Sequence, residues 1–206
     1  MAAVQATCAL RRAVAPGALL TGLPWNLGEL EGLIDSQALR DAAVLIPVVQ
    51  RAHDYSVLLT VRSAALKHHG GQISFPGGRV EPGDRDAVAA ALRETEEEIG
   101  IGAAQIEILG PLDPLATITG FKVLPVLGVI ERLPSLTLDA NEVASVFEVP
   151  LDFLLDRSNQ QRIAREFGGR MRHYHLIEYG PHHIWGATAS ILVNLTDRLE
   201  RAARDG

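Results

Sequence analysis

The sequence of 206 residues is poor in cysteine and has no long hydrophobic run. Cys8 is its single cysteine, which excludes an internal disulfide and a zinc site built from cysteines. No apolar stretch approaches the roughly 18 consecutive residues that a membrane-spanning helix requires. One thiol and the lack of a span lead us to expect a cytoplasmic protein without a membrane partner.

An excess of basic residues is also missing. The chain has 19 Lys and Arg against 25 Asp and Glu, a formal net charge of −6. Such a surface disfavours broad contacts with polyanions, so we expect no general nucleic-acid binding, although a local basic pocket remains compatible with it. Neither G-x-x-x-x-G-K-[ST] nor G-x-G-x-x-G occurs, which removes the two common nucleotide-binding loops from consideration.

The N-terminal segment has no acidic residue before Glu29 and contains Arg11 and Arg12. Two arginines followed by Pro16-Gly17 make a poor transit peptide. The length suits one domain. We therefore expect residues 1–35 to be a loosely ordered or docked extension, and residues 36–206 to be the functional domain.

Strands and helices are mixed along the remaining chain. Short apolar runs rich in β-branched residues, together with a hairpin pattern near the C-terminus, predict strands at 42–49, 56–62, 106–109, 122–130, 143–149, 172–179 and 183–185. Helical patterns occur at 86–99, 151–155 and about 187–204. A final helix after a hairpin favours a mixed sheet with helices on its faces over a doubly wound parallel fold. Residues 63–85 have the composition of a long loop, and such loops are usually functional.

The clearest helix runs from Asp86 to Ile99, where Asp84 or Asp86 can cap the start and Gly100 can close the end. At about 100° per residue, one arc of the helix forms the expected buried stripe, which consists of Val88, Leu92, Thr95 and Ile99. A second arc, well away from the first, gathers Glu94, Glu97 and Glu98.

Three carboxylates on one helical face repel each other. Like charges at i, i+4 cost about 0.2–0.5 kcal/mol each, and a divalent cation would turn that repulsion into attraction. Hard carboxylate oxygens suit Mg²⁺ or Mn²⁺. Arg93 can hold Glu97 at i, i+4 while the other two carboxylates face the metal, and Glu96 projects toward solvent. For an isolated acidic run, a solvated helix face would be the alternative interpretation.

A glycine-containing segment, Phe75-Pro76-Gly77-Gly78, precedes this helix, and paired glycines allow close approach of the backbone to a ligand. Together with Arg93-Glu94-Thr95-Glu96-Glu97-Glu98-Ile99-Gly100-Ile101, it resembles the Nudix box, G-x5-E-x7-R-E-U-x-E-E-x-G-U. Thr95 replaces the usual apolar residue. Asp84 stands where the first glutamate is usual, and one extra residue separates it from Arg93.

The resemblance implies an α/β class of protein with the Nudix fold, an α/β/α sandwich around a mixed β-sheet. It also implies metal-dependent hydrolysis of a nucleoside diphosphate linked to another moiety. Glu94, Glu97 and Glu98 carry over as ligands of Mg²⁺ or Mn²⁺, and Arg93 as their organiser, so these four are the expected catalytic residues. The general base stays open between a box glutamate and a residue of a distant loop.

Residues 58–78 are similar to an additional signature, L-L-T-x-R-S-x-x-L-R-x-H-x-G-Q-x-x-F-P-G-G, of the coenzyme A pyrophosphatase branch, with Lys67 in place of an arginine. This similarity implies cleavage of coenzyme A or acyl-coenzyme A to 4′-phosphopantetheine, or its acyl form, and adenosine 3′,5′-bisphosphate. A substrate with a diphosphate and a 3′-phosphate needs cationic and donor groups beyond the metal. The expected substrate-binding residues are Arg62, Lys67, His69, Gln72, Gly77 and Gly78.

Two kinds of alternative remain open from the sequence. A different Nudix substrate is the first: a nucleoside triphosphate, a nucleotide sugar or capped RNA. The second is a Nudix-like binding module or structural protein without catalysis, which the presence of Glu94, Glu97 and Glu98 disfavours. The preferred acyl group and the formation of a homodimer are also left open.

Overall fold

The computed structural model describes residues 3–14, 22–66, 68–167 and 169–204. Its helices are α1 (Ala3–Ala13), α2 (Ala87–Ile99), α3 (Leu151–Leu155) and α4 (Ala187–Arg204), with short 3₁₀ turns η1 (Leu27–Leu30), η2 (Ala103–Gln105) and η3 (Arg157–Asn159). The main-sheet strands are β1 (Arg40–Gln50), β2 (Tyr55–Arg62), β3 (Ile73–Ser74), β4 (Gly77–Arg79), β5 (Glu107–Pro111), β6 (Leu115–Ala116), β7 (Phe121–Ile130) and β8 (Val143–Pro150). A second sheet contains β9 (Gln161–Phe167), β10 (Arg170–Tyr179) and β11 (His182–Trp185).

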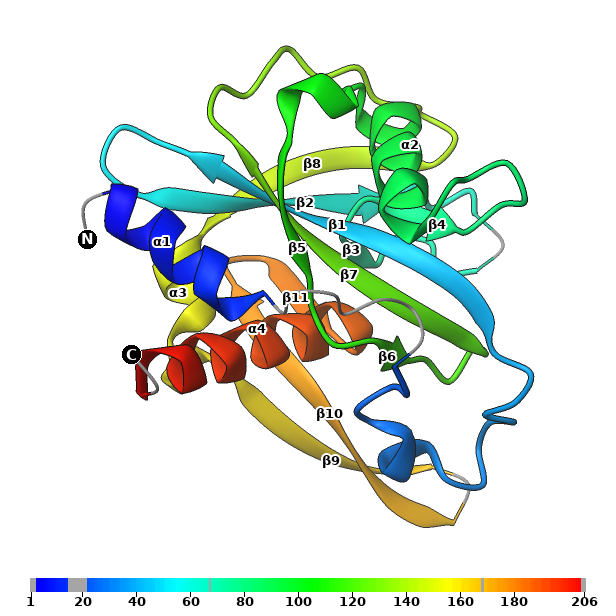
Figure 1. The fold of residues 1–206 in the computed structure, drawn as a ribbon. Coiled ribbons are helices and arrows are strands. Elements are labelled where there is room, and N and C mark those ends of the chain that lie inside the picture. Colours follow the sequence, from blue (N-terminus) through cyan, green and yellow to red (C-terminus); the bar gives the residue numbers. More distant parts are fainter. Residues whose placement is uncertain (1–2, 15–21, 67, 168, 205–206) are drawn as a thin grey trace.

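The main sheet is mixed and is organised around β1 (Figure 1). β1 runs parallel to β7 from the Arg40–Phe121 pair to the Val49–Ile130 pair. Its other edge is shared, because β4 pairs with residues 42–44 and β2 pairs with residues 48–50, both antiparallel. The segment that joins β2 to β4 contains β3, which pairs with β2 at Thr60 and Val61.

β1 is buried on both faces, which explains its almost continuous apolar sequence. Ile46 and Val48 pack into the core that includes α4, whereas Leu45 and Val49 pack into the core that includes α2. The two cores lie on opposite faces because successive side chains of a strand alternate. The predicted mixed sheet with helices on both faces is confirmed.

The second sheet packs onto the α4 side of the molecule. Ile177 of β10 and Ile184 of β11 are fully buried in the same core as α4. The β10–β11 hairpin, α3 and α4 form where the sequence predicts them. The sequence did not predict β9, because Gln161–Phe167 is rich in charge and lacks an apolar alternation of sufficient length.

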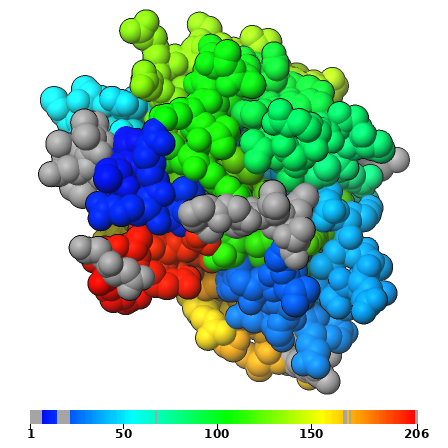
Figure 2. Space-filling model, in the orientation of Figure 1, coloured from blue at the N-terminus to red at the C-terminus, as the bar shows by residue number. Residues whose placement is uncertain are grey.

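Helix α1 lies directly against α4 (Figures 1 and 2). Leu10 and Ala13 are buried in the α4-side core. Arg198 of α4 donates a hydrogen bond to the carbonyl of Ala13 and forms an ion pair with Asp113 at 2.7 Å. The division of the chain at residue 35 stays a prediction, but these contacts tie residues near the N-terminus to the C-terminal helix.

The segment before β1 is held to the main sheet by a buried amide. The side chain of Asn26 donates to the carbonyl of Ala116 and accepts the N–H of the same residue, both at 2.8 Å. This pairing continues the edge of the sheet at β6. Within the described residues, no helix is long and apolar enough to span a membrane.

Candidate active site

Both ends of α2 are fixed by local capping. Asp86 is the N-cap and accepts the N–H of Ala89 at 2.8 Å. Gly100 closes the helix in the left-handed conformation, with φ of 76°, and its N–H donates to the carbonyl of Glu96. Glycine adopts this conformation without the strain that a side chain causes. These caps set where α2 begins and ends.

The buried face of α2 differs from the predicted stripe. It consists of Ala87, Ala90, Ala91, Thr95, Glu98 and Ile99. Val88 and Leu92 are only half-buried beside this face. The small alanines let the helix approach the sheet closely, so the centre of contact falls between the two arcs of the wheel. The prediction that Glu98 lies well away from the buried stripe was wrong, because its side chain is only 2% exposed.

Two glycines bring β4 close to both β1 and α2. A Cβ atom at Gly77, where φ is +150°, would lie 2.3 Å from the carbonyl oxygen of Ala43. A Cβ atom at Gly78 would lie 2.4 Å from Cδ of Glu94. At Gly77 the absence of a side chain therefore leaves room for the backbone of β1. At Gly78 it leaves room for the carboxylate of Glu94.

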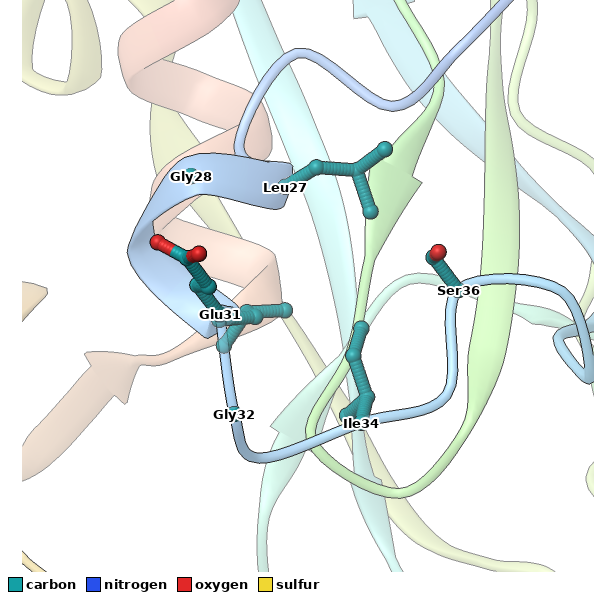
Figure 3. A pocket seen from close by; sticks show the side chains of 7 residues that line it. Leu27, Gly28, Glu31, Gly32, Ile34 and Ser36 are labelled. Atoms are coloured by element: carbon teal, nitrogen blue, oxygen red, sulfur yellow. The ribbon is translucent and has the colours of Figure 1, made fainter.

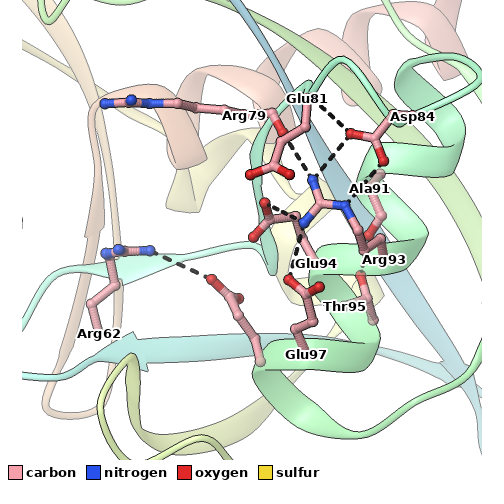
Figure 4. A network of polar contacts seen from close by, with 10 residues as sticks. Arg62, Arg79, Glu81, Asp84, Ala91, Arg93, Glu94, Thr95 and Glu97 are labelled. Atoms are coloured by element: carbon pink, nitrogen blue, oxygen red, sulfur yellow. Dashed lines mark hydrogen bonds and ion pairs between the residues drawn. The ribbon is translucent and has the colours of Figure 1, made fainter.

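Arg93 is the centre of a polar network on α2 (Figure 4). Its Nη1 donates to Glu94 and to Glu97, both at 3.0 Å. Its Nε and Nη2 donate to the two carboxylate oxygens of Asp84 at 3.0 and 3.1 Å, and Nη2 also donates to the carbonyl of Arg79. Arg93 thus holds three carboxylates, where the sequence predicted one.

Asp84 reaches Arg93 despite the extra residue in the box. It also accepts the N–H of Glu81 at 2.8 Å, which closes the turn before α2. The hydrogen bonds from Arg93 hold the pKa of Asp84 below its usual value. A charged Asp84 therefore fixes the guanidinium from the side opposite to Glu94 and Glu97 (Figure 4).

Glu98 is a buried carboxylate with incomplete pairing. Nη1 of Arg62 lies 3.7 Å from its Oε1, and the N–H of Gly77 donates to the carboxylate. Its Oε2 is buried and has no hydrogen-bond partner within the described residues. Burial raises the pKa of Glu98 to about 7, against the charge of Arg62, which lowers it. Oε2 of Glu98 is therefore a buried oxygen that neither a cation nor a hydrogen-bond donor of the described residues satisfies.

A further carboxylate, Glu142, comes from the segment before β8. Its charge contributes to raising the pKa of both Glu94 and Glu98, although burial is the larger cause for each. The segment is tied to the end of α2, because the N–H of Asp139 donates to the carbonyl of Glu98 and that of Thr137 to Ile99. Sequence reasoning missed Glu142, since a lone acid before a strand carries no signal of its own.

The segment after β2 closes into a loop at Arg62. The backbone of Arg62 pairs with Gln72 and Gly71, each at 2.9 Å. At the tip of the loop, Nδ1 of His69 lies 2.9 Å from Oε1 of Gln72, and His69 adopts a φ of 61°. Arg62 is therefore brought to the carboxylates, whereas His69 and Gln72 contact each other. Lys67 lies outside the described residues.

The carboxylates of α2 are not gathered into a preformed metal cage. No group of three or more His, Cys, Asp or Glu side chains in the described ranges has the geometry to hold a metal ion. Arg93 draws Glu94 and Glu97 toward itself, whereas Glu98 faces Arg62. Glu97 is 59% exposed, so its side chain is free to change direction at low cost.

A surface cavity of about 310 Å³ lies elsewhere, in the segment before β1 (Figure 3). Its lining comes from residues 27–36, with Glu31 as its one charged side chain. It has no basic group and no second carboxylate among its lining residues. The chemistry of the molecule therefore concentrates at α2, away from this cavity.

A mixed sheet, a glycine-containing strand and a helix of carboxylates organised by an arginine define the Nudix class of protein. The family described as NUDIX domain matches residues 39–165. The chain belongs to the Nudix hydrolase family.

Relatives from two bacteria carry the description "Uncharacterized Nudix hydrolase NudL". The protein from Citrobacter koseri is 44% identical over 156 residues, which cover 76% of this chain and 81% of the relative. The protein from Photorhabdus laumondii is 39% identical over 163 residues, 78% and 86% of the two chains. A solved MutT/nudix family protein from Enterococcus faecalis is similar in fold, with a TM-score of 0.51, 15% identity, and 98% and 75% coverage. The predicted fold and hydrolase family are confirmed.

Proposed function

We propose that this Nudix hydrolase is a coenzyme A diphosphatase. It would cleave coenzyme A or acyl-coenzyme A to 4′-phosphopantetheine, or its acyl form, and adenosine 3′,5′-bisphosphate. The observation that carries the proposal is the position of Arg62. This arginine belongs to the segment that resembles the coenzyme A branch, and it faces Glu98 of the Nudix helix at 3.7 Å. This contact supports a single site that includes the segment and the helix.

The acidic side chains fit a divalent cation by their donor chemistry. Oε2 of Glu98 is a buried oxygen without a partner in the described part of the chain, and carboxylate oxygens are the donors that Mg²⁺ and Mn²⁺ prefer. We assign Glu94, Glu97 and Glu98 as the ligands, with the charge of Glu142 nearby. When bound, the metal neutralises the oxygens of the diphosphate and lowers the pKa of a bound water.

Arg93 would position these ligands. One guanidinium compensates only part of the charge of Asp84, Glu94 and Glu97, so a negative field remains for the cation. Because Asp84 fixes Nε and Nη2, the Nη1 group that holds Glu94 and Glu97 has a defined direction. Arg93 therefore acts through the carboxylates and not on the substrate.

Glu142 is the acid outside the box that we assign as the proton acceptor for the attacking water. It comes from a different element, and its charge is felt by both Glu94 and Glu98. The water oxygen would bond to one phosphorus, its proton would pass to Glu142, and the bond from that phosphorus to the bridging oxygen would break. A carboxylate held by its backbone to Ser63 and Asp139 is suited to this task.

The test is product identification by chromatography and mass spectrometry after incubation with Mg²⁺ or Mn²⁺. Coenzyme A should compete favourably with ADP-ribose, a nucleotide sugar, nucleoside triphosphates and capped RNA, and should give the two products named above. Preference for another member of this panel would change the assigned substrate and leave the family assignment unchanged. Absence of turnover on every member would favour a binding module. Glu142→Gln should lower kcat about a hundredfold or more while leaving metal affinity within a few-fold.

A further inference from the structure

Two arginines share one aromatic ring at the end of the main sheet. Cζ of Arg40 lies 4.1 Å from the ring centroid of Phe121, and Cζ of Arg79 lies 5.4 Å from it. Arg40 and Phe121 are opposite each other at the starts of β1 and β7, and Arg79 of β4 pairs with Ala42 of β1. Residues 40 and 42 lie on one face of β1, so the three side chains share that face.

Neither guanidinium forms an ion pair with a carboxylate of the described residues. Arg40 donates a hydrogen bond to the carbonyl of Thr119, at 3.3 Å, and the guanidinium of Arg79 lies over the ring of Phe121. Both arginines are exposed. Elsewhere an arginine with a comparable exposure, Arg157, is held by two acids. In a chain with a net charge of −6, two neighbouring cations without an acid indicate an anionic ligand.

This cluster is connected to the catalytic helix through the backbone of Arg79. The carbonyl of Arg79 accepts a hydrogen bond from Arg93 at 3.1 Å, and the preceding Gly78 touches the carboxylate of Glu94. In Figure 4 the side chain of Arg79 extends away from Arg93, toward the side of the view on which the guanidinium of Arg62 lies. The backbone of Arg79 thus joins the arginine cluster to the helix on which we place the diphosphate.

We propose that Arg40, Arg79 and Phe121 bind a phosphate monoester of the substrate that lies outside the scissile diphosphate. A monoester carries nearly two negative charges at neutral pH, and each guanidinium can donate two parallel hydrogen bonds to it. The ring of Phe121 holds the planes of the guanidinium groups and so limits the entropy that binding costs.

The inference rests on the proposed function, in which that monoester is the 3′-phosphate of coenzyme A. A single ribose separates the 3′-phosphate from the 5′-linked diphosphate. The guanidinium of Arg62 already forms an ion pair with the carboxylate of Glu98. We therefore assign the selection for a 3′-phosphate to Arg40 and Arg79 and not to Arg62.

The experiment compares kcat/KM for coenzyme A and 3′-dephospho-coenzyme A, which contain the same scissile bond. Arg40→Gln and Arg79→Gln should each lose about tenfold or more on coenzyme A, mainly through a higher KM, because a charge-assisted bidentate contact is lost. Both variants should retain the wild-type value on the dephospho substrate. The matched control is Arg85→Gln, since the Arg85 side chain is 85% exposed and pairs with its neighbour Asp86.

Equal losses on the two substrates, or no loss on either, would overturn the inference. A second measurement separates it from the proposed reaction. Calorimetric titration with adenosine 3′,5′-bisphosphate and with AMP needs no turnover, and the wild type should bind the bisphosphate more tightly. This preference should disappear in Arg40→Gln and Arg79→Gln. If the wild type binds both nucleotides equally, the cluster is not a 3′-phosphate site, whichever compound the enzyme cleaves.

Discussion

The two faces of the main sheet differ in the side chains that their helices present. On the α4 face, large aliphatic residues of the helix, such as Leu192 and Leu195, pack against strand residues such as Leu127. On the α2 face, the helix presents alanines such as Ala90 to the sheet, where they pack in one core with Ala43 of β1. Small residues allow close approach, and on the α2 face this approach brings Glu98 into the interior and Glu94 against the backbone of Gly78. One face is thus packed for stability, and the other positions carboxylates at some cost in stability.

The largest expected effect is a loss of activity without a loss of stability when a carboxylate of the α2 face is replaced. Glu98→Gln should lower the rate at least about a hundredfold, because a proposed metal ligand is lost. Its melting temperature without metal, at pH 8, should stay unchanged or rise, since burial has raised the pKa of Glu98 and the amide carries no buried charge. Initial rates and thermal unfolding in chelator test this pair of outcomes.

The control for this prediction is Glu97→Gln. Glu97 is also an assigned ligand, but it is exposed, so the same loss of rate should occur without a gain in stability. Excess chelator should abolish the activity of the wild type. Full turnover in chelator, or a Glu98→Gln protein that has unfolded, would contradict the assignment of the α2 face to chemistry.

The reverse pattern is expected on the α4 face. Leu192 is fully buried, and Leu192→Ala should lower the free energy of unfolding by about 2–5 kcal/mol through the lost burial and the cavity. The folded fraction should keep its kcat, because Leu192 packs in the α4-side core, on the opposite face of the sheet from α2. Denaturant titration and initial rates on the same preparation measure both quantities. Leu23→Ala, at a residue 82% exposed, is the control and should be neutral. A loss of kcat with intact folding would show that the two faces are coupled.

A smaller effect concerns the pH dependence of folding without metal. The pKa of Glu98 is about 7 in the folded protein, above its ordinary value of 4.5. The folded state therefore binds more protons between these pH values, so this residue makes the protein lose stability as the pH rises from 4.5 to about 7. Between pH 4.5 and 8 the loss is roughly 1–3 kcal/mol. The difference in unfolding free energy between wild type and Glu98→Gln, measured in chelator across this range, isolates the effect; a constant difference would disprove it.

The smallest expected effect is at Glu96. It is exposed near the end of α2, and its carboxylate lies near Gly102. Glu96→Gln should keep turnover and metal affinity within about twofold, because surface charges contribute little. The metal dependence of the initial rate, measured beside that of Glu98→Gln, provides the test. An equal impairment in both variants would mean that Glu96 reaches a metal ion.

The sequence was sufficient wherever local chemistry decides the structure. Asp86 and Gly100 cap α2 by contacts within a few residues, and α4 begins after a hairpin that the sequence also predicts. The burial of Glu98 was not predictable, because it depends on how closely the alanines of α2 approach β1. Helical periodicity weighs large apolar residues and gives small ones little weight.

Long-range contacts account for the other differences. Glu142 reaches the site only because Thr137 and Asp139 attach their segment to the end of α2. Helix α1 is placed by a hydrogen bond from Arg198 to the carbonyl of Ala13, a contact between opposite ends of the chain. A single sequence contains no record of such contacts. It therefore predicts the carboxylates of α2 but not the residues from distant segments that lie beside them.

The network around Arg93 has a consequence for how the protein is made. Its guanidinium is a covalently attached cation inside a group of acids, and it cannot dissociate as a metal ion can. Repulsion among Asp84, Glu94 and Glu97 is therefore relieved as soon as the chain folds. The polypeptide can therefore fold without a divalent cation, and under the proposed function its activity can follow the supply of Mg²⁺ or Mn²⁺ without a cycle of unfolding and refolding.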